Sequence, residues 1–305
     1  MAGGAAITVV TKSGTNELHG SAFAFHTNNH LKARNFFFVG ALPRSSRNID
    51  GFTLGGPIKK NKLFFFGGWE GMWERQEASG FYTVATADQR EGNFSAYGTT
   101  LYDPATGAAN GTGRTPFANA TIPMSRQSEV TRKMQALVPT PNLPGVNSNF
   151  FNSGTLVFDR HNYDAKVNWN RTDSHSLFVK FSAMDGNVNC AFALGAAGGA
   201  ALGGCGAPGN GHTRTMISTI GHTWTLSPRL IVDGTVGWTR MEQQGLSPDY
   251  GKNFGLETLG IPGTNGPDPR QSGMPGFTLT TLLGVRQHRQ PSPQYLRGPK
   301  LHNQP

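Results

Sequence analysis

The chain has 305 residues, of which 41 are glycine and 20 are phenylalanine, while only 15% are charged. This composition favours strands and long loops over packed helices. A mean hydropathy of −0.38 and the absence of any apolar run of about 18 residues exclude a helical membrane protein. The net charge is +9, but the basic residues are scattered, which argues against a nucleic-acid partner.

Alternation of apolar and polar residues with a period of two predicts seven strands. This period sends successive side chains to opposite faces of a sheet, as in residues 63–74, where Phe65, Trp69 and Trp73 fall on the face opposite to Glu70. We expect each strand to be 9 to 12 residues long, near the length that crosses a bilayer when tilted. The predicted strands cover residues 20–25, 48–58, 63–74, 162–169, 175–184, 215–226 and 230–241.

The connections between these strands alternate between short and long. Short polar turns are predicted at 59–62, 170–174 and 227–229, and residues 76–161 form a long insertion with one helix near 126–137. Short turns at one end and long loops at the other are typical of outer-membrane barrels. The sequence therefore predicts an all-β fold, a partial antiparallel transmembrane barrel with short periplasmic turns and long extracellular loops. A soluble β-sandwich remains the alternative.

Two groups of residues are candidate features of such a barrel. Five tryptophans, most of them near predicted strand ends, are candidates for an interfacial aromatic girdle rather than a ligand-stacking platform. Cys190 and Cys205 share a Gly/Ala-rich segment, and a disulfide or two free thiols fit the sequence equally well. The five girdle candidates are Trp69, Trp73, Trp169, Trp224 and Trp238.

Other motifs do not assemble into a catalytic or metal site. The G-x-G-x-x-G match at 204–209 contains Pro208 and lacks a preceding strand and a following helix. Glu70 and Glu74 would lie about 13 Å apart on a strand, too far for paired-carboxylate chemistry. We therefore expect no enzyme, no cofactor and no metal.

Several ordered motifs are similar to TonB-dependent receptors, and more narrowly to the Oar-like group with a carboxypeptidase regulatory-like domain. The resemblance covers about residues 3 to 245. It is carried by Gly3–Asn16 with Leu18-His19-Gly20, Ala33–Phe37, Leu54–Lys60, Phe64–Gly71, Asp103–Gly107, Ile122–Arg126 and Asn162–Val167.

This resemblance implies a solute transporter in the outer membrane of a Gram-negative-type bacterium. Residues 1–16 would be the end of a plug domain and residues 17–283 the N-terminal part of the barrel. The implied partners are outer-membrane lipid and lipopolysaccharide, the TonB complex through the remainder of the plug, and an unknown solute. A surface binding or adhesion β-protein without transport is the alternative.

The two ends of the sequence differ from what the resemblance implies. No signal peptide, TonB box or regulatory domain is present, so we expect the chain to be a fragment. Residues 284–305 lack any strand period, and we expect a truncated or out-of-frame tail there.

Overall fold

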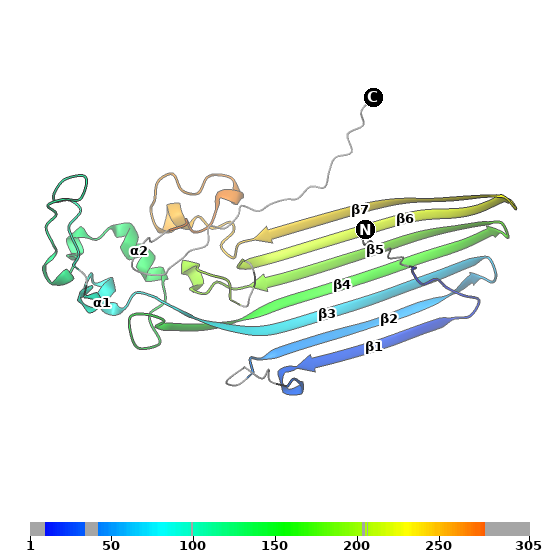
Figure 1. Cartoon of the computed structure of the whole chain (residues 1–305), viewed down its shortest axis with the longest axis horizontal. Helices are drawn as coiled ribbons and strands as arrows, with labels where there is room; N and C mark the ends of the chain where they lie inside the picture. Colours follow the sequence, from blue (N-terminus) through cyan, green and yellow to red (C-terminus); the bar gives the residue numbers. More distant parts are fainter. Residues whose placement is uncertain (1–9, 34–41, 99, 203–204, 206, 278–305) are drawn as a thin grey trace, which may run out of the picture.

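Seven long strands form one antiparallel sheet in chain order, from β1 to β7 (Figure 1). The structure is a computed structural model, and it describes residues 10–33, 42–98, 100–202, 205 and 207–277. The predicted tail at 284–305 and most of the predicted plug segment lie outside these residues. The strands are β1 (His19–Asn28), β2 (Ser45–Lys59), β3 (Leu63–Tyr82), β4 (Phe150–Thr172), β5 (His175–Cys190), β6 (Gly209–Ser227) and β7 (Leu230–Leu246).

All seven predicted strands are present, and every one of them is longer than its predicted bounds. Only β1, with 10 residues, falls within the expected range, and the others have 15 to 23 residues. The extra length lies mainly at the ends away from the short turns. The long insertion is correspondingly shorter than predicted, since β3 continues to Tyr82 and β4 begins at Phe150.

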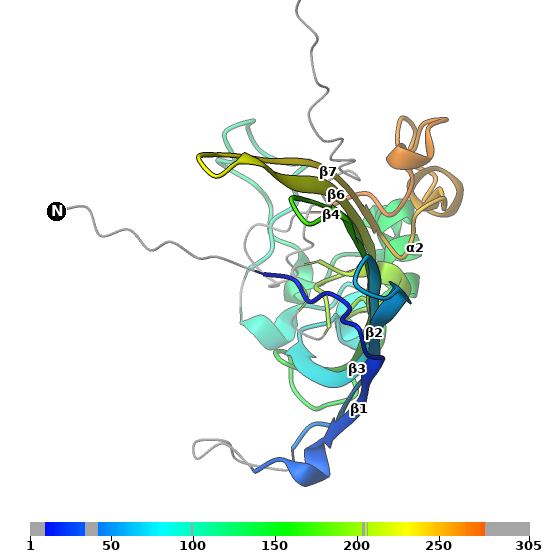
Figure 2. The same cartoon turned by 90° about the vertical axis from the view of Figure 1, so that its right-hand side faces the viewer.

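Short turns join the strands at one end of the sheet, at the predicted places. Each turn is accompanied by a register shift in the ladder, between Pro57 and Lys59, Asn170 and Thr172, and Thr225 and Ser227. Bulges of this kind are common at the rims of barrels, where they raise the local twist. The described sheet is curved but open, because β1 and β7 each pair with one neighbour only (Figure 2).

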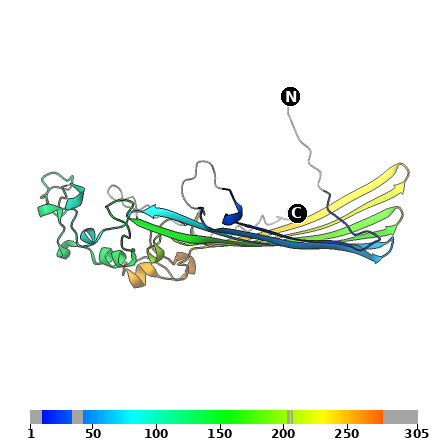
Figure 3. The same ribbon diagram turned by 90° about the horizontal axis from the view of Figure 1, so that it is seen from below.

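The helices gather at the opposite end of the sheet (Figures 1 and 3). The connection 83–149 carries α1 (Ala87–Arg90) and α2 (Glu129–Leu137), so the predicted helix is confirmed. Short 3-10 turns lie at Asn29–Leu31, Ser95–Tyr97, Ala118–Ala120, Met124–Arg126, Gly195–Ala197 and Pro269–Gln271, and a π-helical turn at Phe254–Thr258.

The connection 83–149 packs against the described part of the connection 191–208, and we call these two segments together the outer lobe. Its core is a cluster of buried apolar side chains, which Tyr82, Leu137, Val138 and Phe150 partly cover. The lobe therefore holds the main apolar core of the described chain. The cluster consists of Val84, Ala193, Leu194, Ala197 and Leu202.

Two polar side chains tie the outer lobe together. Asn149, which has no exposed surface, accepts a hydrogen bond from the Val84 amide and donates one to the Val84 carbonyl, both at 2.9 Å. The Arg90 guanidinium donates to the carbonyls of Gln135, Val138 and Pro139 at 2.6 to 3.1 Å. Arg90 thus satisfies carbonyl groups at the C-terminal end of α2, and its burial lowers the pKa of its guanidinium.

Candidate functional site

The convex face of the sheet is apolar and exposed. In an antiparallel ladder, directly paired residues share a face, so the register assigns every side chain of the seven strands to one face or the other. Large apolar residues that are more than a third exposed gather on this face. They include Phe52, Leu54, Tyr163, Val167, Val179, Phe181, Ile220 and Val236. A continuous apolar surface of this extent is unfavourable in water and indicates contact with lipid or protein.

All five candidate tryptophans lie on this convex face. Trp169 and Trp224 lie near the short turns, each three residues from the end of its strand. Trp69 and Trp73 lie in the middle of β3 and form a cluster of three rings with His161, with centroids 6.0 and 5.4 Å from that of His161 and 6.1 Å from each other. The expected position near a strand end was wrong for Trp73 and Trp238, because their strands continue beyond the predicted ends.

The apolar band on the convex face ends where charged pairs begin. Just beyond Trp73, Arg75 donates two hydrogen bonds to the Asp159 carboxylate at 2.6 and 3.2 Å. On the neighbouring strands, Asp185 lies 3.4 Å from the Arg214 guanidinium. The band from Leu63 to Trp73 covers about 33 Å along the strand at about 3.3 Å per residue. At a tilt of about 40° its height is about 25 Å, the height of the apolar band of outer-membrane barrels.

The concave face carries the chain segment that precedes β1. In Figure 2 this segment, in dark blue, leaves the sheet on its inner side. At the short-turn end, Asn16 donates to Asn61 Oδ1 at 2.6 Å and accepts from the Asn61 amide at 2.7 Å. Further along, Lys166 on β4 donates to the hydroxyl and the carbonyl of Thr11, at 3.0 and 3.3 Å. The segment is thus attached to the wall at two points.

Glycine allows this segment to approach the wall closely between the two points. A Cβ atom on Gly14 would lie 2.2 Å from the Phe65 carbonyl oxygen and 2.6 Å from that of Gly56. Both neighbours are backbone atoms of paired strands and cannot move aside without breaking the ladder. Gly14 of the T-K-S-G-T-N motif is therefore required by the contact of one backbone with another.

A cavity of about 420 Å³ lies between the segment and the concave wall. Lys12, Lys166 and Lys180 line it, together with Glu70 and Asp164. Glu70 is paired with Arg160 at 2.9 Å, and Asp164 accepts a hydrogen bond from Ser182 at 2.5 Å. Glu70 thus faces the interior, on the side of the sheet opposite to Trp69. This part of the concave wall therefore carries charged and polar groups beside the aromatic rings of Phe23 and Phe66, in contrast to the convex face.

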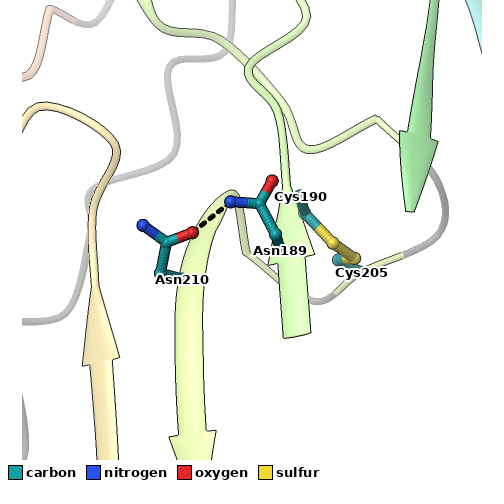
Figure 4. Close-up of a disulfide and its surroundings, with 4 residues drawn as sticks. All are labelled: Asn189, Cys190, Cys205 and Asn210. Atoms are coloured by element: carbon teal, nitrogen blue, oxygen red, sulfur yellow. Dashed lines mark hydrogen bonds between the residues drawn. A yellow bond between two sulfur atoms is a disulfide. The ribbon is translucent and has the colours of Figure 1, made fainter. Parts of the chain in front are cut away.

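Cys190 and Cys205 are joined by a disulfide at the outer end of the sheet (Figure 4). Cys190 is the last residue of β5 and is 2% exposed. Beside the bond, Asn189 donates a side-chain hydrogen bond to Asn210 on β6. The disulfide closes the connection 191–208, which carries part of the apolar core of the outer lobe.

The described residues hold no group of three His, Cys, Asp or Glu side chains that could bind a metal ion. Within the same part of the chain, no helix has the length and apolar character needed to span a membrane. The His26 side chain on β1 forms a 2.5 Å hydrogen bond with Asn48 on the neighbouring strand.

Comparison with known proteins supports the membrane location that the apolar convex face indicates. The model of the outer membrane beta barrel domain family matches residues 10–297. The chain is 34% identical over 97 residues to the "TonB-dependent transporter Oar" of Myxococcus xanthus, an alignment that covers 30% of this chain and 9% of that protein. No solved structure matches. The chain belongs to the outer membrane beta barrel domain family, and its place is the outer membrane.

Proposed function

We propose that the chain forms part of a TonB-dependent transporter that takes up a solute across the outer membrane. The observation that carries the proposal is the attachment of residues 11–16 to the concave wall, by Asn16 to Asn61 and by Thr11 to Lys166. A segment that enters the interior of a barrel and is held there by a few polar contacts is suited to end a plug that must later move. The similarity to a protein named as a TonB-dependent transporter supports the same function.

In this proposal, residues 1–16 end the plug and residues 17–283 belong to the barrel. The short turns face the periplasm, and the outer lobe faces the outside, where the Cys190–Cys205 bond persists because the compartment is oxidising. Trp169 and Trp224 lie at the inner lipid interface, and Trp73 lies at the outer one, with Trp69 and Trp238 within the band. The convex face contacts lipid and lipopolysaccharide, and the TonB complex acts through the plug.

The proposal assigns solute binding and transport to the concave face, and no catalytic step. The alternative, a surface binding or adhesion protein without transport, would use the outer lobe and would not require a movable segment. The double hydrogen bond of Lys166 to Thr11 favours transport, because a lysine bound to one hydroxyl and one carbonyl forms a weak, reversible attachment.

The test is a comparison of solute depletion by three cell populations. Cells that carry the gene, cells from which it is deleted, and gene-carrying cells without TonB are incubated in a medium that contains defined peptides and oligosaccharides. We expect at least one solute to disappear only when both the gene and TonB are present. Binding of a solute to the cells without its uptake would overturn the transport proposal in favour of the adhesion alternative.

A further inference from the structure

A second cavity lies on the concave face, closer to the outer lobe, and its volume is about 430 Å³. Two neighbouring rows of paired residues across β4 to β7 form its floor and walls. One row contains Phe158, Val188, Gly211 and Gly245, and the other contains Arg160, Gly186, Thr213 and Gln243. The volume lies within the range of about 300 to 1,000 Å³ that is typical of ligand pockets.

The cavity exists because three of these wall positions are glycine. A Cβ atom on Gly245 would meet no atom within 4 Å, and one on Gly186 would come no closer than 3.8 Å to the Thr213 carbonyl oxygen. Neither glycine has the positive φ that would exclude another residue. Fold and packing therefore do not require glycine at Gly186 or Gly245, although glycine within a strand lowers its stability. A ligand that approaches the backbone closely provides a reason for glycine at both positions.

The chemistry of the cavity is mainly apolar, with a few amide and hydroxyl groups. Phe158, Val188 and Met184 provide apolar surface, and Thr213 and Gln243 provide hydrogen-bonding groups on one side. The one charged group that lines the cavity is Arg160, and Glu70 offsets its charge at 2.9 Å. The cavity is therefore close to neutral, and a charged ligand would lose hydration without finding a partner.

We propose that this cavity, bounded by Phe158, Gly186 and Gly245, binds an uncharged peptide that carries an apolar side chain. The apolar side chain occupies the space above the glycines, and the peptide groups on either side of it hydrogen-bond with Thr213 and Gln243. A sugar fits less well, because most of its hydroxyl groups would face apolar walls and remain unpaired. The inference rests on the proposed transport function, for which it supplies the class of solute.

The test measures binding of one defined probe to the full chain in isolated outer membranes. The probe is the tetrapeptide Gly-Phe-Leu-Gly, blocked by an N-acetyl and a C-amide group. Gly-Glu-Asp-Gly with the same blocking groups and maltotriose serve as comparison ligands. We expect Gly245→Leu, whose Cβ atom would meet no protein atom within 4 Å and whose side chain would occupy the cavity, to weaken binding of the probe by about 30-fold or more.

Gly237→Leu is the matched control, because Gly237 lies on the same strand and the same face. A Cβ atom on Gly237 would come no closer than 3.8 Å to any neighbouring atom, but Gly237 does not line the cavity. We expect this variant to bind the probe within about 2-fold of the unaltered chain. The two variants add the same side chain to the same strand. The amount of folded protein in each is measured from its heat-modifiable band on a gel. Comparable amounts would show that Gly245→Leu loses binding without losing its fold.

Equal binding of the probe by the Gly245→Leu and unaltered proteins would overturn the proposed site, as would tighter binding of maltotriose than of the probe. Neither result would bear on TonB-dependent uptake of another solute. Conversely, probe binding that Gly245→Leu abolishes, without uptake of the probe or of any other solute that requires both the gene and TonB, would leave the peptide site intact and overturn the transport proposal.

Discussion

The wall formed by the seven strands and the outer lobe place their apolar residues in opposite environments. On the convex face of the wall, Val236 is 76% exposed and Ile220 is 57% exposed. In the outer lobe, Ala193 is 0% exposed and Val84 is 1% exposed. The lobe is thus built like a small water-soluble protein around its own core. The wall has an apolar surface but no comparable core, so its stability depends on lipid against the convex face.

The largest effect is expected from a charge on the convex face of the wall, which contacts lipid. Ile220 lies on the convex face of β6, and its neighbour Thr219 lies on the concave face. We expect Ile220→Arg to lower the free energy of unfolding in a bilayer by up to about 4 kcal/mol, since a charge near the bilayer midplane loses its hydration.

Thr219→Arg is the control for this change, because it adds the same side chain one residue away on the interior face. We expect it to change the free energy of unfolding by less than about 1 kcal/mol. Denaturant titration of the protein refolded in lipid vesicles measures both values. Equal destabilisation by the two arginines would show that the two faces are not in different surroundings.

The disulfide tests whether the lobe is an independent structure. It closes a loop over a sequence separation of 15 residues, for which loop-closure entropy predicts about 3 kcal/mol of stabilisation. We expect Cys190→Ser to loosen the lobe and leave the wall folded. Limited proteolysis should then cut the connection 191–208 first, while the strands remain protected. Simultaneous loss of protection in the strands would contradict the separation of the two regions.

The buried side chain of Asn149 tests how much hydrogen bonds in the core stabilise the outer lobe. Its two hydrogen bonds to Val84 are buried, so Asn149→Ala leaves a buried amide and carbonyl unpaired. We expect a local loss of about 2 kcal/mol, seen as faster hydrogen exchange at the Val84 amide. Asn152→Ala is a suitable control, because the hydrogen bond that its side chain donates to the Ala193 carbonyl is only partly buried and the one it accepts from the Ser153 amide is exposed. A smaller effect at Asn149 than at Asn152 would contradict the role of burial.

The smallest expected effect concerns the inner side of the wall. Lys166→Met removes the two hydrogen bonds to Thr11 and keeps most of the length of the side chain. We expect about 1 kcal/mol less stabilisation of the bound segment, seen as faster exchange of amides near Thr11 with little change in the wall. Lys180→Met, which also changes a lysine lining the cavity, is the control. Faster exchange in Lys180→Met than in Lys166→Met would contradict the attachment.

The existence of the strands could be predicted from the sequence, but their outer ends could not. Between Leu63 and Glu74 one face is apolar and alternation is visible, since lipid requires it. From Gln76 to Gly80 both faces are polar or small, and the strand continues because it pairs with β4, as in Phe81 with Phe151. That pairing joins residues 70 positions apart, and no local pattern reveals it.

The candidate site was predicted only in part for the same reason. The tryptophans stand out in a period-two pattern, so their common face followed from the sequence. The attachment of Lys166 to Thr11 joins residues 155 positions apart, and the cavity above Gly186 and Gly245 depends on the register of four strands. The sequence showed that Cys190 and Cys205 are close in the chain, but it did not show that they form a disulfide. The pairing of β5 with β6 brings the two ends of the connection 191–208 together.

The central claim is that one face of the wall contacts lipid and the other contacts the polar interior. The most direct test is a spin-label scan along β5 from Leu177 to Met184 in isolated outer membranes, with one added cysteine at each position. Collision rates are measured with oxygen, which concentrates in lipid, and with a water-soluble nickel complex. We expect the labels at Leu177, Val179, Phe181 and Ala183 to favour oxygen and those at the positions between them to favour nickel. A uniform response along the strand, or the opposite alternation, would contradict the account.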